Sequence, residues 1–185
     1  HQQMPNGDRL RGSDNSVQSG LILPWPGDAS GKRYALFISP APESFSGDPN
    51  ESLTLSVIDM NADNGLGDVA EKNTVVLPSS SEKLTAVRHC NGRDWWILAH
   101  GRGDDRFYAF RLSPKGIVDT VMTQIGAPHS PEGIRRSEGW IKTSPNGKKV
   151  AVVVWNNFDQ PRPSFVELLD FDNRTGTFSK VIRIL

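Results

Sequence analysis

The sequence predicts an all-β protein, an arc of about three four-stranded antiparallel blades within a larger β-propeller of about seven blades. A turn glycine followed by an apolar run occurs three times, and its glycines, Gly31, Gly92 and Gly147, lie 61 and 55 residues apart. The chain also holds 17 glycines and 13 prolines, enough for many turns, and no stretch shows a helical period. A repeat of this length in an all-strand pattern is typical of stacked or radial units.

The first unit spans residues 17–78 and follows a polar connector at 1–16, which is interpreted as a loop or the end of a preceding blade. Leu53, Leu55 and Val57 alternate with polar residues, and this pattern predicts a half-buried strand. The strands expected in this unit are 17–23, 34–39, 53–57 and 73–77.

Two further units follow, at residues 82–126 and 138–185. The last unit has the clearest hairpin signal, because Asn146-Gly147 suits a type I′ turn, which needs positive φ at both central residues. The continuous apolar run at 150–155 predicts a strand that is covered on both faces. The expected strands are 83–90, 95–100, 107–112 and 120–125 in one unit, and 139–143, 150–155, 165–171 and 178–185 in the other.

The connections between strands predict where a ligand would bind. Links between the second and third strands and between units vary in length, whereas the other turns are tight. In a meander the variable links emerge at one end, and propellers usually bind their ligands there. A β-sandwich of the same strands is the alternative, but a sandwich has no reason to repeat its turn chemistry at this period.

Ring closure is expected to need more than these three units. Three blades leave two open edges, which favour pairing with other strands. We therefore expect an arc of a larger propeller, completed by its remaining blades, or one piece of an assembly in which another chain closes the ring.

Composition excludes several classes of function. The 21 basic and 21 acidic residues cancel, so no electrostatic footprint for nucleic acid is present. No apolar stretch approaches the roughly 20 residues of a membrane helix, and we expect no membrane insertion. Cys90 is the single cysteine, which excludes an internal disulfide. Nothing in the sequence predicts a cofactor.

Six spaced strings carry a resemblance to a known family. Together and in this order they resemble the WD40-like propeller region near the N-terminus of large secreted Bacteroidota proteins, which end with a type B sorting domain for type IX secretion. The resemblance implies further blades before His1 and after Leu185, an extracellular or cell-surface location, and a binding or adhesion role. It brings no catalytic residues. The strings are Gln3–Gly7, Gln18–Pro24, Gly65–Val69 with Lys72-Asn73, Glu82–His89, Ser144–Lys149, and Leu169–Asn173 with Thr175-Gly176.

We expect a protein or polysaccharide ligand at the variable-loop face. Trp155 with nearby carboxamides suits carbohydrate, because tryptophan supplies an apolar face and asparagine both donates and accepts hydrogen bonds. The simpler interpretation is a strand-end tryptophan that seals the gap between blades. Arg102-Gly103-Asp104 matches an integrin-binding tripeptide, although a solvated turn explains it more simply. The predicted ligand-binding residues are His100, Arg102, Asp104, Trp155, Asn156, Asn157 and Asp159.

Two motifs suggest metal or nucleophile chemistry only superficially. His89 and Cys90 are adjacent on an expected strand, so they point to opposite faces, and a buried thiol with a structural histidine is favoured. The segment 170–176 has the oxygen-rich start of a calcium loop, but Val181 occupies the position of the bidentate glutamate. A hairpin turn rich in Asx residues is favoured there, and no metal site is predicted.

The sequence therefore favours a non-enzymatic binding, adhesion or interaction scaffold. The alternative is a propeller glycan hydrolase or lyase that uses acidic residues of the variable face: Asp104, Asp105, Glu132 and Asp159. A convergent acidic pair with a raised pKa would distinguish the enzyme. A third interpretation is a structural arc whose open blade edges form its interface.

Overall fold

The computed structural model describes residues 3–12, 16–39, 51–129, 138–154 and 164–184. Within these residues twelve strands form three four-stranded antiparallel sheets, and a short 3-10 turn, η1 (Asp63–Gly65), is the helical element. The prediction of an all-β fold is confirmed. The first sheet holds β1 (Gly20–Pro24), β2 (Arg33–Ile38), β3 (Leu53–Asp59) and β4 (Asp68–Leu77). The middle sheet holds β5 (Ser80–Arg88), β6 (Trp95–Gly101), β7 (Arg106–Ser113) and β8 (Gly116–Gln124). The third holds β9 (Ile141–Thr143), β10 (Lys149–Val154), β11 (Phe165–Asp172) and β12 (Thr177–Ile184).

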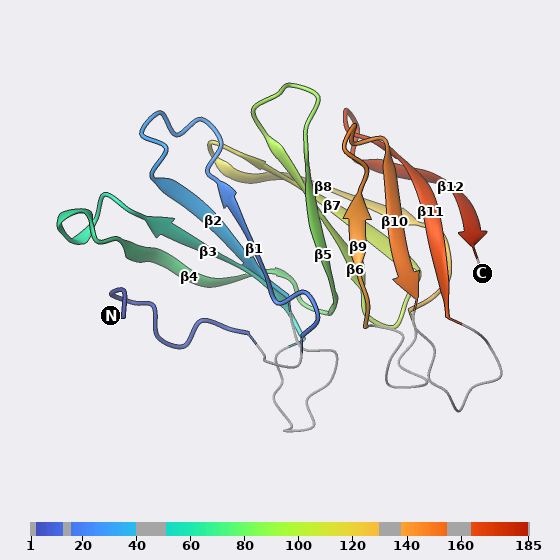
Figure 1. Ribbon diagram of the computed structural model, residues 1–185, viewed down its shortest axis with the longest axis horizontal. Coiled ribbons are helices and arrows are strands. Elements are labelled where there is room, and N and C mark those ends of the chain that lie inside the picture. The colour runs from blue at the N-terminus through green and yellow to red at the C-terminus, as the bar shows by residue number, and fades with distance from the viewer. Residues whose placement is uncertain (1–2, 13–15, 40–50, 130–137, 155–163, 185) are drawn as a thin grey trace.

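The three sheets follow one another as an open arc. In each sheet every strand pairs with the next strand in sequence. The first strands of the sheets are neighbours, because β5 lies between β1 and β9 and contacts both (Figure 1). Successive blades of a propeller are arranged in this way, and a closed ring would need further sheets.

Two apolar layers hold the sheets together. Leu23, Phe37 and Leu55 of the first sheet belong to one buried cluster with residues of the middle sheet such as Ile97 and Phe110. A second buried cluster joins the middle and third sheets. Its main members are Val87, Trp96, Leu98, Phe107, Ile141, Val150, Val152, Leu169, Phe171 and Phe178. The middle sheet is therefore covered on both faces, which explains the uninterrupted apolar run 95–99 in β6.

β10 departs from the prediction that both of its faces are covered. Val150, Val152 and Val154 are buried, but the intervening Ala151 and Val153 are only half-buried. The inner face of this strand packs on the middle sheet, and its other face belongs to the outer side of the third sheet. Among the described residues, no fourth sheet lies on that side.

β4 is longer than the sequence predicts. It begins at Asp68 rather than at residue 73, and its pairing with β3 is irregular. Asn73, with a φ of 58°, accepts a hydrogen bond from Arg11 N and donates one to Arg9 O. Val69 N donates to Pro5 O. The N-terminal segment therefore runs beside this strand, and its contacts stabilise polar residues that show no strand alternation by themselves.

The same hydrogen bond joins the sheets at both junctions. Gln18 Oε1 of the first sheet accepts the N–H of Leu84 at 3.4 Å. Glu82 Oε1 of the middle sheet accepts the N–H of Gly139 at 2.7 Å. Gln18, just before β1, and Glu82, in β5, each lie six residues before the last residue of β1 and β5 respectively. Their donors, Leu84 and Gly139, each lie four residues before the last residue of β5 and β9 respectively. The repeat in sequence thus corresponds to a repeated contact between sheets.

A glycine at the β11–β12 turn allows close packing on a buried tryptophan. Gly176 has a φ of 76°, and a Cβ there would lie 2.8 Å from the ring of Trp96. We expect Gly176→Ala to lower the free energy of unfolding by about 1–3 kcal/mol more than Gly116→Ala. Gly116 is the matched control, because it also has positive φ (92°) at a hairpin turn but nothing lies within 4 Å. Urea unfolding of both variants checks this, and equal losses would contradict it.

No helix of the described residues has the length and apolar character that are needed to span a membrane.

Candidate functional site

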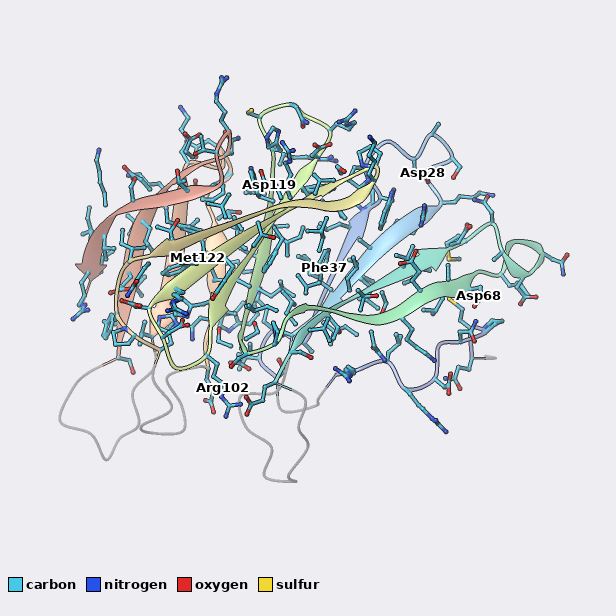
Figure 2. All side chains as sticks on the ribbon, turned by 180° about the vertical axis from the view of Figure 1, so that it is seen from behind. Asp28, Phe37, Asp68, Arg102, Asp119 and Met122 are labelled. Atoms are coloured by element: carbon cyan, nitrogen blue, oxygen red, sulfur yellow. The ribbon has the colours of Figure 1, made fainter. Side chains whose placement is uncertain are left out.

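Loops of the first and middle sheets meet at one end of the arc, which we call the loop end. Arg102 follows β6 and donates its N–H to Ser79 O (3.3 Å). Its guanidinium pairs with Glu51, which precedes β3, at 2.6 Å. Figure 2 shows Arg102 at this end of the molecule. The described connections within the hairpins lie at the opposite end. The predicted difference in length is met only in part, because the β4–β5 link at the loop end is just residues 78–79 while the β1–β2 connection at the other end spans residues 25–32.

Asp104 shapes the β6–β7 turn. Its carboxylate accepts the N–H of Arg106 (3.0 Å), and its main-chain oxygen accepts the N–H of His129 (2.8 Å). Gly103, with a φ of 80°, donates its N–H to His129 O. The Arg102-Gly103-Asp104 tripeptide is therefore a hydrogen-bonded turn. The Arg102 and Asp104 side chains remain 19% and 30% exposed.

His100 lies in the interior beneath the loop end and has no exposed surface. Its ring stacks on His129 with centroids 3.5 Å apart and meets Phe107 edge-on at 4.4 Å. Burial lowers the pKa of His100 to about 3, so the ring is neutral near pH 7. A hydrogen bond of 2.7 Å links Nδ1 to Gly101 O and places the proton on Nδ1. Of the predicted ligand residues in the described part of the chain, Arg102 and Asp104 reach the surface and His100 does not.

Two adjacent charged residues of β5, Glu82 and Lys83, are fully buried next to this site. Glu82 accepts main-chain N–H groups with both oxygens, from Gly139 at 2.7 Å and from Val17 at 2.8 Å. Burial raises the pKa of Glu82, although these two hydrogen bonds act in the opposite direction. One carboxylate thus links the segments that enter the first and third sheets to the middle sheet.

The Lys83 ammonium donates to Glu138 O at 2.8 Å. Burial lowers its pKa from 10.5 to about 7, while Glu82 and Glu138 act in the opposite direction. A lysine in this environment exchanges its proton near neutral pH, so the interior beneath the loop end can change its charge.

A second buried carboxylate, Glu167 of β11, holds the connection between the middle and third sheets. Its oxygens accept the N–H of Ala127 at 3.1 and 3.2 Å. Arg183 of β12 donates to it at 3.2 Å. Both of these buried carboxylates therefore serve as acceptors for groups of the fold.

Sequence reasoning missed Glu82, Lys83, His129 and Glu167. Glu82 and Lys83 stand at the start of the unit expected at 82–126, and charged residues in such a position usually lie in solvent. Their burial depends on neighbouring sheets that the local pattern does not show. The spacing that Glu82 shares with Gln18 is a signal in the sequence for Glu82 alone. Four predicted site residues, Trp155, Asn156, Asn157 and Asp159, lie outside the described residues.

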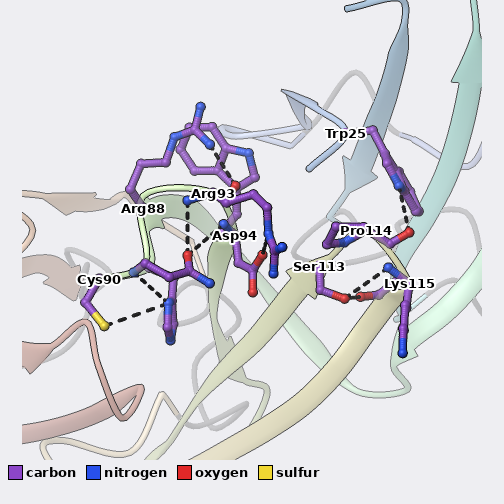
Figure 3. A network of polar contacts seen from close by, with 12 residues as sticks. Trp25, Arg88, Cys90, Arg93, Asp94, Ser113, Pro114 and Lys115 are labelled. Carbon is purple, nitrogen blue, oxygen red and sulfur yellow. Dashed lines mark hydrogen bonds and ion pairs between the residues drawn. The ribbon is translucent and has the colours of Figure 1, made fainter. Parts of the chain in front are cut away.

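The tight-turn end has an open groove of about 330 Å³ between the turns that follow β5 and β9. Arg88 and Trp95 line it, and the guanidinium lies 3.6 Å from the ring centroid. Arg88 also donates to Arg93 O, and Arg93 pairs with Asp94 (Figure 3). These side chains are occupied in supporting the turn.

The structure shows the surroundings of the residues that were considered as metal ligands or nucleophiles. Cys90 is exposed, so the prediction of a buried thiol is wrong: the residue lies in the turn after β5 rather than in the strand. His89 is buried and accepts the N–H of Asn91 with Nδ1. Asp172 accepts the N–H of Arg174 within the β11–β12 turn, as expected for an Asx-rich hairpin. Across the described residues no three His, Cys, Asp or Glu side chains gather as metal ligands would.

Comparisons with known proteins give little beyond this geometry. No protein family and no curated protein matches the chain. A solved structure that is similar is a Bacteroides fragilis protein named as a candidate 6-phosphogluconolactonase, at 17% identity and a TM-score of 0.47. The alignment covers 94% of this chain and 44% of that protein, so the chain spans less than half of its length. At this level the comparison assigns neither a family nor an activity.

Proposed function

We propose that the chain is an arc of a β-propeller that acts as a non-enzymatic binding or interaction module. It contacts a protein or a polysaccharide at the loop end. One observation carries this proposal: the buried carboxylates Glu82 and Glu167 both accept hydrogen bonds from main-chain N–H groups of the segments that lead from or into a sheet.

A glycan hydrolase would need a different arrangement of carboxylates. Its two acidic side chains face each other across the substrate, and one keeps a proton near neutral pH. Glu82 has the raised pKa of such an acid, but its two oxygens are directed at Val17 N and Gly139 N. A proton on either oxygen would make that oxygen a weaker acceptor for its main-chain N–H, so the contacts of Glu82 support a structural role.

The loop end offers polar groups instead. The partly exposed Arg102 guanidinium pairs with Glu51 across the junction of two sheets, and Asp104 is partly exposed on the next turn. Such groups suit hydrogen bonds to sugar hydroxyls or to a protein surface. The proposal includes an extracellular or cell-surface location, which is supported by the resemblance of six strings to secreted Bacteroidota propeller regions.

Retention in gels that contain a polysaccharide tests this function. We expect Arg102→Ala to weaken retention by a neutral glucan or an acidic polyuronate about ten- to a hundredfold, because one charged hydrogen bond contributes roughly 1.5–3 kcal/mol. Arg174→Ala is the matched control, since Arg174 is an exposed arginine of the tight-turn end. Reducing ends are measured in parallel. Cleavage of either polymer by the chain would contradict the non-enzymatic proposal, and unchanged retention of Arg102→Ala would exclude the loop end as the site.

A further inference from the structure

Two main-chain hydrogen bonds join His129 to the β6–β7 turn at the loop end. Gly103 N donates to His129 O at 2.9 Å, and His129 N donates to Asp104 O at 2.8 Å. We call this pair of bonds the His129 contact. His129 follows Gln124, the last residue of β8, so the contact holds the turn that carries Arg102 and Asp104 against the segment that leads out of the middle sheet.

The side chain of His129 anchors this contact in the interior. It has no exposed surface, and its ring stacks on that of His100 with centroids 3.5 Å apart and an angle of 21° between the planes. His100 is equally buried and meets Phe107 edge-on, at 88°. The position of the partly exposed turn therefore depends on two buried imidazole rings beneath it.

The surroundings of His100 suit a neutral ring and oppose a second proton. Nδ1–H donates to Gly101 O, and Nε2 has no hydrogen-bond partner among the described residues. A proton on Nε2 would make the ring a buried cation with an unsatisfied donor. It would also place a positive charge against the stacked ring of His129, where two protonated imidazoles repel each other.

The charged groups of the neighbouring elements do not compensate for such a proton. Burial is the main reason that the pKa of His100 is lowered to about 3, and repulsion from Lys83 of β5 lowers it further. Glu138 acts on Lys83, from which its main-chain oxygen accepts a hydrogen bond. The carboxylates on the packed elements accept hydrogen bonds from other groups: Glu82 of β5, Asp104 and Asp105 of the turn, and Glu167 of β11.

We propose that the stacked pair of His100 and His129 is an acid-sensitive switch of the loop end. Proton uptake by the pair separates the rings, breaks the His129 contact and releases the β6–β7 turn. The inference rests on the proposed function, because the released turn is the one that presents Arg102 and Asp104 to a ligand. The sign follows from His100. Its pKa is about 3 in the closed form and returns to the ordinary 6.5 when the ring is released, so a fall in pH between these values favours the open form.

Amide hydrogen exchange of the 185-residue chain, followed by nuclear magnetic resonance at pH 7 and pH 5, tests the switch without a ligand. We expect the protection factors of the Gly103 and His129 amides to fall about 25-fold at pH 5, because the open form gains a proton on a ring of pKa 6.5. The amide of Ile97, in the central strand β6, should stay protected. The pKa of Lys83 is about 7, so this residue contributes little between pH 7 and pH 5.

Two variants remove the titrating group in different ways. His100→Phe keeps an aromatic ring for the stack, and His100→Gln keeps a hydrogen-bond donor for Gly101 O. In either variant the protection of the Gly103 and His129 amides should be the same at both pH values. His89→Gln is the matched control, because His89 is a buried histidine of the tight-turn end, and this variant should show the same loss of protection as the parent chain.

Retention by a neutral glucan is then compared at the two pH values, since this polymer has no group that titrates between them. The parent chain should be retained less at pH 5, and His100→Phe should be retained equally. Unchanged protection in the parent chain, an equal loss in the folded His100 variants, a loss that includes Ile97, or unchanged retention at pH 5 by a chain that binds at pH 7 would overturn the inference. The expected amide pattern in a chain that binds no polymer at pH 7 would contradict the proposed function and leave the switch standing.

Discussion

Glu82→Ala is expected to lower the free energy of unfolding by about 1–4 kcal/mol, because the buried Gly139 N–H loses its acceptor at roughly 1–3 kcal/mol and the half-buried Val17 N–H loses less. The donors are Val17 N, which leads into the first sheet, and Gly139 N, which leads into the third. Loss of the carboxylate therefore affects both junctions of the middle sheet. Urea denaturation followed by tryptophan fluorescence measures the change.

Three comparison variants make this prediction specific. Glu82→Gln keeps one carbonyl acceptor and should lower the free energy of unfolding by an intermediate amount. Gln18→Ala removes the equivalent acceptor at the first junction, where one longer bond of 3.4 Å is made, and should cost less than Glu82→Ala. Glu71→Ala alters an exposed glutamate with a 3.9 Å ion pair and should have little effect. A loss for Glu82→Ala no larger than that for Glu71→Ala would show that the carboxylate does not hold the sheets.

Lys83→Met is expected to change how the free energy of unfolding depends on pH, because an apolar side chain of similar length replaces a group whose pKa differs between the folded and the unfolded chain. The pKa of Lys83 is about 7 in the folded chain and 10.5 for an ordinary lysine. Between these values the unfolded chain holds a proton that the folded chain lacks, so the stability of the parent protein rises with pH.

Unfolding measured from pH 7 to pH 10 checks this sign. The free energy of unfolding should rise with pH in the parent chain and in Lys115→Met, a control at an exposed lysine. This rise should be smaller in Lys83→Met. His100, with a pKa of about 3, produces a similar rise only between about pH 3 and its ordinary 6.5, so it does not interfere. Parallel curves for the parent and Lys83→Met would mean that Lys83 keeps its charge in the fold.

The positions of most strands follow from the sequence because each depends on local signals. Turn glycines such as Gly92 and Gly147 precede apolar runs, and the strands β6 and β10 begin within three residues of them. β4 was predicted too short, because its first half is polar and is stabilised by hydrogen bonds to residues 3–12. These hydrogen-bond partners lie some 60 residues away in the chain, so they leave no alternation of polar and apolar residues in β4 itself.

The candidate site was less predictable than the fold. Arg102 and Asp104 lie at the surface of the predicted end, because a meander determines which turns share an end. His100 has an interior position that the sequence does not reveal, since alternation along β6 is hidden when both faces are covered. The burial of Glu82 and Lys83 could not be predicted either, because charged residues enter the interior only where specific partners compensate their desolvation.

The sequence by itself determined the all-β class, the repeat and the order of the antiparallel strands, since turn chemistry and side-chain alternation act between near neighbours. Tertiary structure alone decided which charged groups are buried and which sheet faces are covered. These properties depend on contacts between sheets that are distant in sequence. The same valine run in β10 is compatible with a covered or an open face until its neighbours are in place.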